Sequence, residues 1–119
     1  MRDAILQNRM KKFLVLYRMD MAAMKKMMEE TSAEDRRKGM EEWGVWMKKN
    51  MANFADGGAP LGKNTQVSSS GAKEMRNDIG GYSILQAESA EAAAKILADN
   101  PHFKMPGAVV DVMEAVPMG

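Results

Sequence analysis

The first strongly apolar segment of the chain is KFLVLYR, at positions 12–18, and both faces of the strand it predicts are apolar. One face carries Phe13, Val15 and Tyr17, and the other carries Leu14 and Leu16. A strand of this kind lies in the middle of a sheet whose two faces are both covered. Helices in a chain of 119 residues can cover only one face well. We therefore expect the other face to meet the sheet of a second copy, in a homodimer.

Two helices are predicted after this strand. Asp20 caps a short helix with methionines at helical spacing, namely Met21, Met24, Met27 and Met28. Ser32 opens a longer helix that closes near Phe54, with Asp35 three residues on as in a capping box. Its expected core stripe is Met40, Trp43, Met47 and Met51. Gly44 lies mid-helix, where glycine costs about 1 kcal/mol relative to alanine, and a close contact with the sheet would explain it.

Turns and strands follow these helices. Residues 55–62 combine turn chemistry with a short strand suited to a sheet edge, and 64–71 form a second short strand or one arm of a hairpin. Residues 72–78 are polar and are predicted to be a mobile loop. Residues 79–87, IGGYSILQA, predict a strand whose glycine pair indicates a bulge or a close backbone approach.

The end of the chain adds one helix and one strand. Ser89 caps the helix, which must stop before Pro101, and residues 107–116 form the last strand. The order of strand, helix pair, strands, helix and strand is that of a ferredoxin-like split βαβ fold. We expect an α+β domain with an antiparallel sheet over residues 11–118, after an N-terminal extension at 1–10.

Composition excludes several classes of function. A formal net charge of +1 gives no electrostatic reason to expect nucleic acid or a membrane surface as a partner. The absence of cysteine excludes disulfides, thiolate metal sites and a cysteine nucleophile. No segment reaches the ~18 apolar residues of a membrane span, so a cytoplasmic protein is expected. Scattered carboxylates and one histidine offer no metal-ligand spacing, and we expect neither a metal nor a cofactor.

The fourteen methionines are unusually many for a chain of this length. Methionine fills irregular gaps in cores, and it also lines surfaces that adapt to varied apolar ligands. Core packing is the simpler interpretation, and an adaptable binding surface is the alternative.

Five residues are candidates for a functional site. His102, after a helix-ending proline, could move a proton or bind an anion, or its ring could simply bond a backbone carbonyl. Asp111 interrupts an apolar strand and could act as a base in a cleft, or lie solvated on an edge strand. Tyr17, Trp43 and Tyr82 could line a ligand cleft, although aromatic residues at these spacings are also typical of a core.

Five segments stand in order from Met10, namely MKKFLVLY, GMEEWGVWM, GGAPLG, GGYSILQAES and NPHFKMPGAVVDVMEAVP. Together these segments resemble the YCII-related (DGPF-domain) family of dimeric α+β barrel proteins. The resemblance implies two subunits that pack their sheet faces together, with a cleft in each. Relatives carry a histidine early in the long helix, paired with an aspartate as a proposed dyad. Here that segment reads GMEE at 39–42, and His102 lies elsewhere.

The sequence leaves three functions open. The first is a small homodimer that binds a partly apolar metabolite in a cleft between sheet and loops. The second is a cofactor-free enzyme of the isomerase, lyase or oxygenase type, with His102 and Asp111 moving a proton. The third is a structural partner whose dimer face is its only function.

Overall fold

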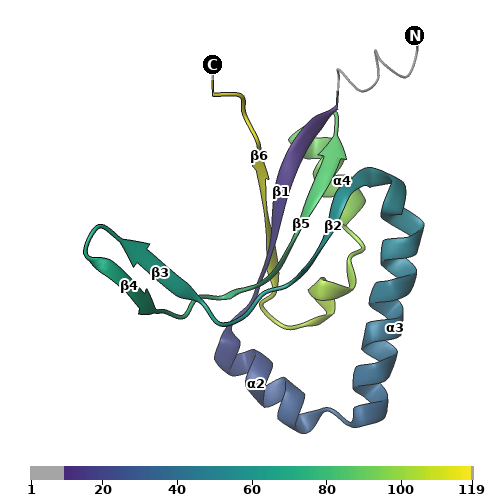
Figure 1. Cartoon of the computed structure of the whole chain (residues 1–119). Helices are drawn as coiled ribbons and strands as arrows, with labels where there is room; N and C mark the ends of the chain where they lie inside the picture. Colours follow the sequence, from purple (N-terminus) through teal and green to yellow (C-terminus); the bar gives the residue numbers. More distant parts are fainter. Residues whose placement is uncertain (1–9, 119) are drawn as a thin grey trace.

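The computed structural model describes residues 10–118 and contains a four-stranded antiparallel sheet with helices packed on it (Figure 1). The sheet has the order β2-β5-β1-β6. Its strands are β1 (Lys11–Arg18), β2 (Phe54–Pro60), β5 (Ile79–Ala87) and β6 (Val109–Glu114). The helices are α2 (Met21–Glu30), α3 (Ala33–Asn50) and α4 (Ala90–Leu97), with short 3-10 turns η1 (Met51–Asn53) and η2 (Pro101–Lys104). This order is that of a ferredoxin-like sheet, so the predicted α+β fold is confirmed.

Local capping explains where each helix begins. The Asp20 side chain accepts a hydrogen bond from Ala22 N at the start of α2. Ser32 and Ser89 do the same at the start of α3 and α4, where they accept from the backbone three residues on. Each bond satisfies one of the backbone N–H groups that a helix leaves free at its first turn. The three predicted caps are therefore confirmed.

The core lies on one face of the sheet, between the strands and helices α3 and α4. It is formed by Phe13, Val15, Tyr17, Trp46, Leu85, Ala87, Ala93 and Leu97. The predicted stripe of α3 is wrong in part, because Met40 and Met51 are 76% and 65% exposed whereas Trp46 is only 5% exposed. Trp46 is held in place by its indole N–H, which donates to the Asp99 carboxylate at 2.9 Å. Trp43 and Met47 do pack against the core, as predicted.

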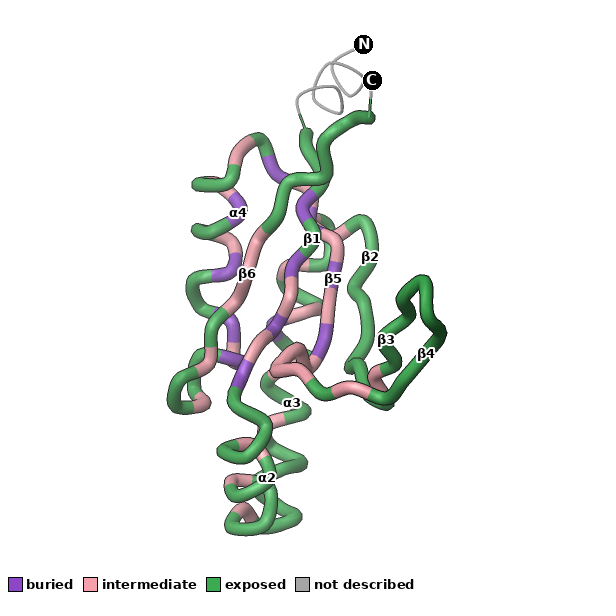
Figure 2. The backbone as a smooth tube through the Cα atoms, turned by 90° about the vertical axis from the view of Figure 1, so that its left-hand side faces the viewer, coloured by how far each residue is buried: buried purple, intermediate pink, exposed green. Residues whose placement is uncertain are grey.

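The second face of the sheet is open in the single subunit. Buried and partly exposed residues alternate along β1 and β5 (Figure 2). Leu14 is 37% exposed although its neighbours Phe13 and Val15 are fully buried. Its cross-strand partners on this face are Ile84 of β5 and Met113 of β6. No helix among residues 10–118 covers this row, which matches the expectation that one face is left for another molecule.

Two local predictions are corrected and one is confirmed. The segment 72–78 is not simply a loop, because β4 (Gly71–Glu74) pairs with β3 (Thr65–Ser68) in a separate hairpin. Gly44 has no close contact with the sheet, since a Cβ there would meet nothing within 4 Å. The predicted bulge is present, as a register shift opposite Tyr17 and Arg18. The predicted extension at 1–10 lies outside the described residues, except for Met10.

Among residues 10–118, none of the helices combines the length and the apolar character that crossing a membrane requires.

Candidate functional site

A cavity of about 420 Å³ lies between the sheet and helices α2 and α3. Its lining consists of Tyr17, Met19, Met24, Met40, Trp43, Met47, Gly57, Gly58, Ala59, Pro60, Gly80, Gly81, Tyr82, His102 and Met105. The volume is within the range of sites that bind small molecules, which is ~300–1,000 Å³. Among the described residues that line it, none is a lysine, arginine, aspartate or glutamate. The cavity is therefore apolar in character, with a few polar groups.

Five methionines converge on this cavity from separate parts of the chain. Met24 belongs to α2, Met40 and Met47 to α3, and Met19 and Met105 to the segments that follow β1 and η2. Met19 is buried at 5% exposure, whereas Met40 is 76% exposed. Unbranched thioether side chains adjust easily to the shape of a bound molecule. The alternative interpretation of the methionines, an adaptable apolar surface, therefore has a physical location.

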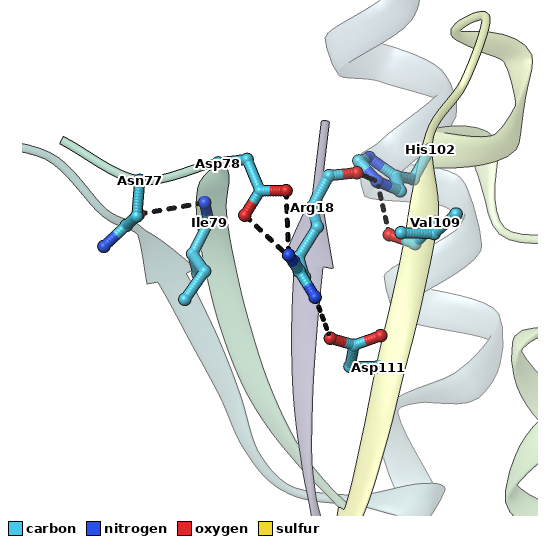
Figure 3. Close-up of polar contacts among 7 residues, drawn as sticks. All are labelled: Arg18, Asn77, Asp78, Ile79, His102, Val109 and Asp111. Atoms are coloured by element: carbon cyan, nitrogen blue, oxygen red, sulfur yellow. Dashed lines mark hydrogen bonds and ion pairs between the residues drawn. The ribbon is translucent and has the colours of Figure 1, made fainter. Parts of the chain in front are cut away.

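His102 borders the cavity and is only 4% exposed. Its Nε2 lies 2.9 Å from the carbonyl oxygen of Arg18 and 3.1 Å from that of Val109 (Figure 3). These two carbonyls belong to paired residues at one end of the β1–β6 ladder. Asn100 fixes the backbone of this turn, because its Oδ1 accepts from His102 N at 2.8 Å. The histidine thus bonds backbone carbonyls, which was one of the roles predicted for it, and it also borders the cavity.

Tyr17 and Trp43 form an aromatic corner of the cavity. Their ring centroids are 5.3 Å apart with an interplanar angle of 83°, which is an edge-to-face contact. The ring of Tyr17 also makes an edge contact with His102 at 5.6 Å. The hydroxyl of Tyr17 is bonded to that of Ser83 at 2.8 Å, inside the core. Burial raises the pKa of Tyr17 above its ordinary value, and hydrogen bonding to its oxygen offsets part of the rise.

Tyr82 borders the cavity, but its side chain is directed elsewhere. It lies between the buried residues Gly81 and Ser83 of β5, so the alternation of the strand turns it to the open face. Its hydroxyl donates to Oδ2 of Asp56 at 3.3 Å. The other oxygen of Asp56 accepts from Gly58 N at 2.8 Å. The tyrosine therefore supports the β2 edge of the cavity.

Gly58 allows β2 to approach β5 closely at this edge. Its φ is 78°, a left-handed conformation that residues with a side chain rarely adopt. A Cβ at this position would also run into the carbonyl oxygen of Tyr82. The glycine pair at 57–58 thus shapes the wall of the cavity through its backbone.

Asp111 lies away from the cavity, on the open face of β6. Its Oδ2 accepts from Nη1 of Arg18 at 2.7 Å, and Arg18 also donates twice to Asp78, at 2.9 and 3.0 Å (Figure 3). Both carboxylates are 41% exposed, so the network is partly solvated. The hydrogen bonds from Arg18 lower the pKa of Asp78 below its ordinary value. Since β6 is a terminal strand of the sheet, the edge-strand interpretation of Asp111 describes its position.

The structure thus brings Tyr17, Trp43 and His102 together with Tyr82 at one cavity, and it does not bring Asp111 there. The sequence interpretation missed Arg18 and Asp78, because only the fold places them beside Asp111. It also did not specify which methionines meet. Among residues 10–118, no group of three or more His, Asp or Glu residues could hold a metal ion.

The fold of this chain is similar to that of a solved structure over most of the length of both chains. It is 5-chloro-2-hydroxyhydroquinone dehydrochlorinase (TftG) from Burkholderia phenoliruptrix AC1100, in complex with 2,5-dihydroxybenzoquinone. The TM-score is 0.51 and the identity is 15%, over 91% of this chain and 95% of that chain. No protein-family model matches the chain, and no curated protein matches it significantly. At this identity the similarity establishes the fold alone.

Proposed function

We propose that this protein is a homodimer in which each subunit binds a small, partly apolar metabolite in the methionine-lined cavity. The observation that carries the proposal is the cavity itself, about 420 Å³ in volume and walled by thioether and aromatic side chains. Burial of apolar ligand surface against these walls would supply most of the affinity. The similar dehydrochlorinase structure, which holds a dihydroxybenzoquinone, gives the proposal further support.

The proposed dimer rests on the open face of the sheet. Leu14, Ile84 and Met113 form an apolar row across β5, β1 and β6. Leu14 and Met113 are 37% and 45% exposed, and no helix of residues 10–118 is placed to cover them. A second copy presents the same row, so two such faces match in apolar character and in extent. Members of the YCII-related family, which the sequence resembles, pack sheet faces together in this way. The proposed dimer therefore agrees with membership of that family.

Ligand binding can be tested with a neutral fluorescent probe, N-phenyl-1-naphthylamine, whose emission rises in apolar sites. We expect saturable binding to the wild type. Trp43→Ala should weaken it at least tenfold, because the aromatic corner is lost. Val45→Ala is the matched control, since Val45 lies on the same helix but is 69% exposed and outside the lining. Absence of saturable binding, or equal weakening in both variants, would contradict the proposal.

A cofactor-free enzyme is a second candidate because His102, the histidine of the predicted pair, borders the cavity. Asp111 is bonded to Arg18 on the other face, so His102 would act there without it. Such an enzyme would exchange an acidic C–H proton of a bound carbonyl compound with solvent deuterium. The exchange should be lost in His102→Gln and kept in Asp111→Asn, which is detectable by mass spectrometry. Exchange that survives in His102→Gln would exclude this role.

A further inference from the structure

The hydrogen bonds of His102 fix which of its ring nitrogens carries the proton. Both partners of Nε2 are backbone carbonyl oxygens, those of Arg18 and Val109, and a carbonyl can only accept. Nε2 must therefore be the N–H donor. In the neutral ring, Nδ1 is then left with a free lone pair. The two ring nitrogens point in divergent directions, so Nδ1 faces away from these carbonyls. It makes no hydrogen bond within residues 10–118.

The other polar side chains around the cavity are already engaged or turned away. The hydroxyl of Tyr17 is bonded to Ser83, and that of Tyr82 donates to Asp56. Among the described lining residues there is no charged side chain to neutralise a carboxylate or a phosphate. With Nε2 as the donor, a bound molecule is offered the Nδ1 acceptor of that tautomer and no ion-pair partner among the described lining residues. This selects a neutral ligand that brings a hydrogen-bond donor.

The walls specify the rest of the ligand. The edge-to-face pair of Tyr17 and Trp43 presents aromatic surface. Met19, which follows β1, and Met105, which follows the turn that holds His102, add thioether surface to the lining. Thioether sulfur makes favourable contacts with aromatic rings. A flat aromatic molecule would use both kinds of wall.

From this geometry we infer that the ligand is a neutral hydroxylated aromatic compound of the phenol class, whose hydroxyl donates to Nδ1 of His102. This inference rests on the proposed binding function, and it adds the chemical class of the ligand and the residue that selects it. No proton needs to be transferred. His102 would act as a specificity-determining acceptor, held in the required tautomer by the backbone of β1 and β6.

The test compares two probes on the wild-type protein, 2-naphthol and 2-methoxynaphthalene. They share one ring system, but the ether has no hydroxyl to donate. The ether is also the more apolar of the two, so burial alone would favour it. We expect isothermal titration calorimetry to show at least tenfold tighter binding of 2-naphthol. Equal binding, or tighter binding of the ether, would overturn the inference and leave the proposed cavity function standing. Failure of both probes to bind would overturn both.

Two further measurements assign the preference to His102. His102→Gln should bind both probes with similar affinity, whereas Met40→Leu, another lining variant, should keep the preference for 2-naphthol. If His102→Gln does not fold, ¹⁵N spectra of the wild-type histidine serve instead. The Nδ1 resonance should move with 2-naphthol and stay in place with the ether. A preference that persists in His102→Gln, or an Nδ1 resonance that ignores 2-naphthol, would exclude His102 as the acceptor.

Discussion

The hydroxyl groups of Tyr17 and Ser83 lie 2.8 Å apart inside the core and join strands β1 and β5 beneath the cavity. Ser83 is fully buried and Tyr17 is only 8% exposed, so water cannot replace either partner. The ring of Tyr17 at the same time forms one wall of the cavity. The stability of the core and the shape of the cavity are therefore linked through one side chain.

Removal of one partner of this pair should be costly, because the other is left buried without a hydrogen bond. We expect Ser83→Ala and Tyr17→Phe each to lower the free energy of unfolding by about 1–3 kcal/mol. The double variant should lose less than the sum of the two, with a coupling of roughly 0.5–3 kcal/mol. Urea unfolding of the four proteins measures this cycle. Strictly additive losses would show that the bond does not contribute.

The raised pKa of Tyr17 makes the fold sensitive to alkali. The folded state keeps the phenol protonated at a pH where the unfolded state, with a pKa near ~10, already ionises. Stability is therefore complete below about pH 10 and falls as the pH rises toward the folded pKa of Tyr17. This fall in stability should appear in unfolding experiments from about pH 8 to about pH 11, a range that spans the ordinary pKa of tyrosine. It should be smaller in Tyr17→Phe, and an unchanged slope in that variant would contradict the assignment.

The lowered pKa of Asp78 makes the stability of the fold sensitive to acid, whereas the raised pKa of Tyr17 makes it sensitive to alkali. Its ion pair with Arg18 contributes stability above the unfolded pKa of ~4, and this contribution is lost as the pH falls through the folded pKa. Asp78→Asn should therefore reduce the acid dependence of thermal unfolding. Glu88→Gln is a suitable control, because Glu88 has no ion pair among residues 10–118. Equal acid profiles for wild type and Asp78→Asn would refute the prediction.

Two glycines should respond in opposite ways to alanine. At Gly58 the new Cβ would collide with the Tyr82 carbonyl in a left-handed backbone, so a strong loss of stability is expected. At Gly44 a Cβ meets nothing within 4 Å in the middle of a helix. Gly44→Ala should stabilise the protein by about 0.5–1 kcal/mol. Thermal unfolding compares the two, and a stable Gly58→Ala would mean that β2 has another route past β5.

The open sheet face should control assembly. Leu14→Glu would place a charge in the proposed dimer contact, and we expect a monomer in sedimentation velocity. Val67→Glu, in the exposed β3–β4 hairpin at 77% exposure, should leave the wild-type oligomer intact. A wild type that sediments as a monomer would contradict the homodimer directly. A dimer that tolerates Leu14→Glu would place the contact elsewhere.

Much of the fold could be predicted because its signals are local. The alternation in KFLVLYR, the caps at Asp20, Ser32 and Ser89, and the stop at Pro101 each act within a few residues. The β3–β4 hairpin was missed in part because its strands are short, polar and fully exposed. Such strands carry no apolar alternation to reveal them.

The candidate site was predicted less completely, because its geometry depends on contacts between distant residues. His102 bonds the carbonyl of Arg18 across 84 positions, and Arg18 reaches Asp111 across 93. Neither spacing leaves a pattern in the sequence. Helical spacing also could not show that Met40 borders the cavity while Trp46, beside the predicted stripe, fills the core.

Arg18 is held from both sides of the sheet at once. Its carbonyl accepts from His102 on the side of the helices, and its guanidinium grips Asp78 and Asp111 on the opposite side. A displacement of the Arg18 backbone would therefore strain both the bond to His102 and the bonds to Asp78 and Asp111. Because both sets of bonds belong to the last residue of β1, a change in the turn that borders the cavity can alter the ion pairs on the open face of the sheet.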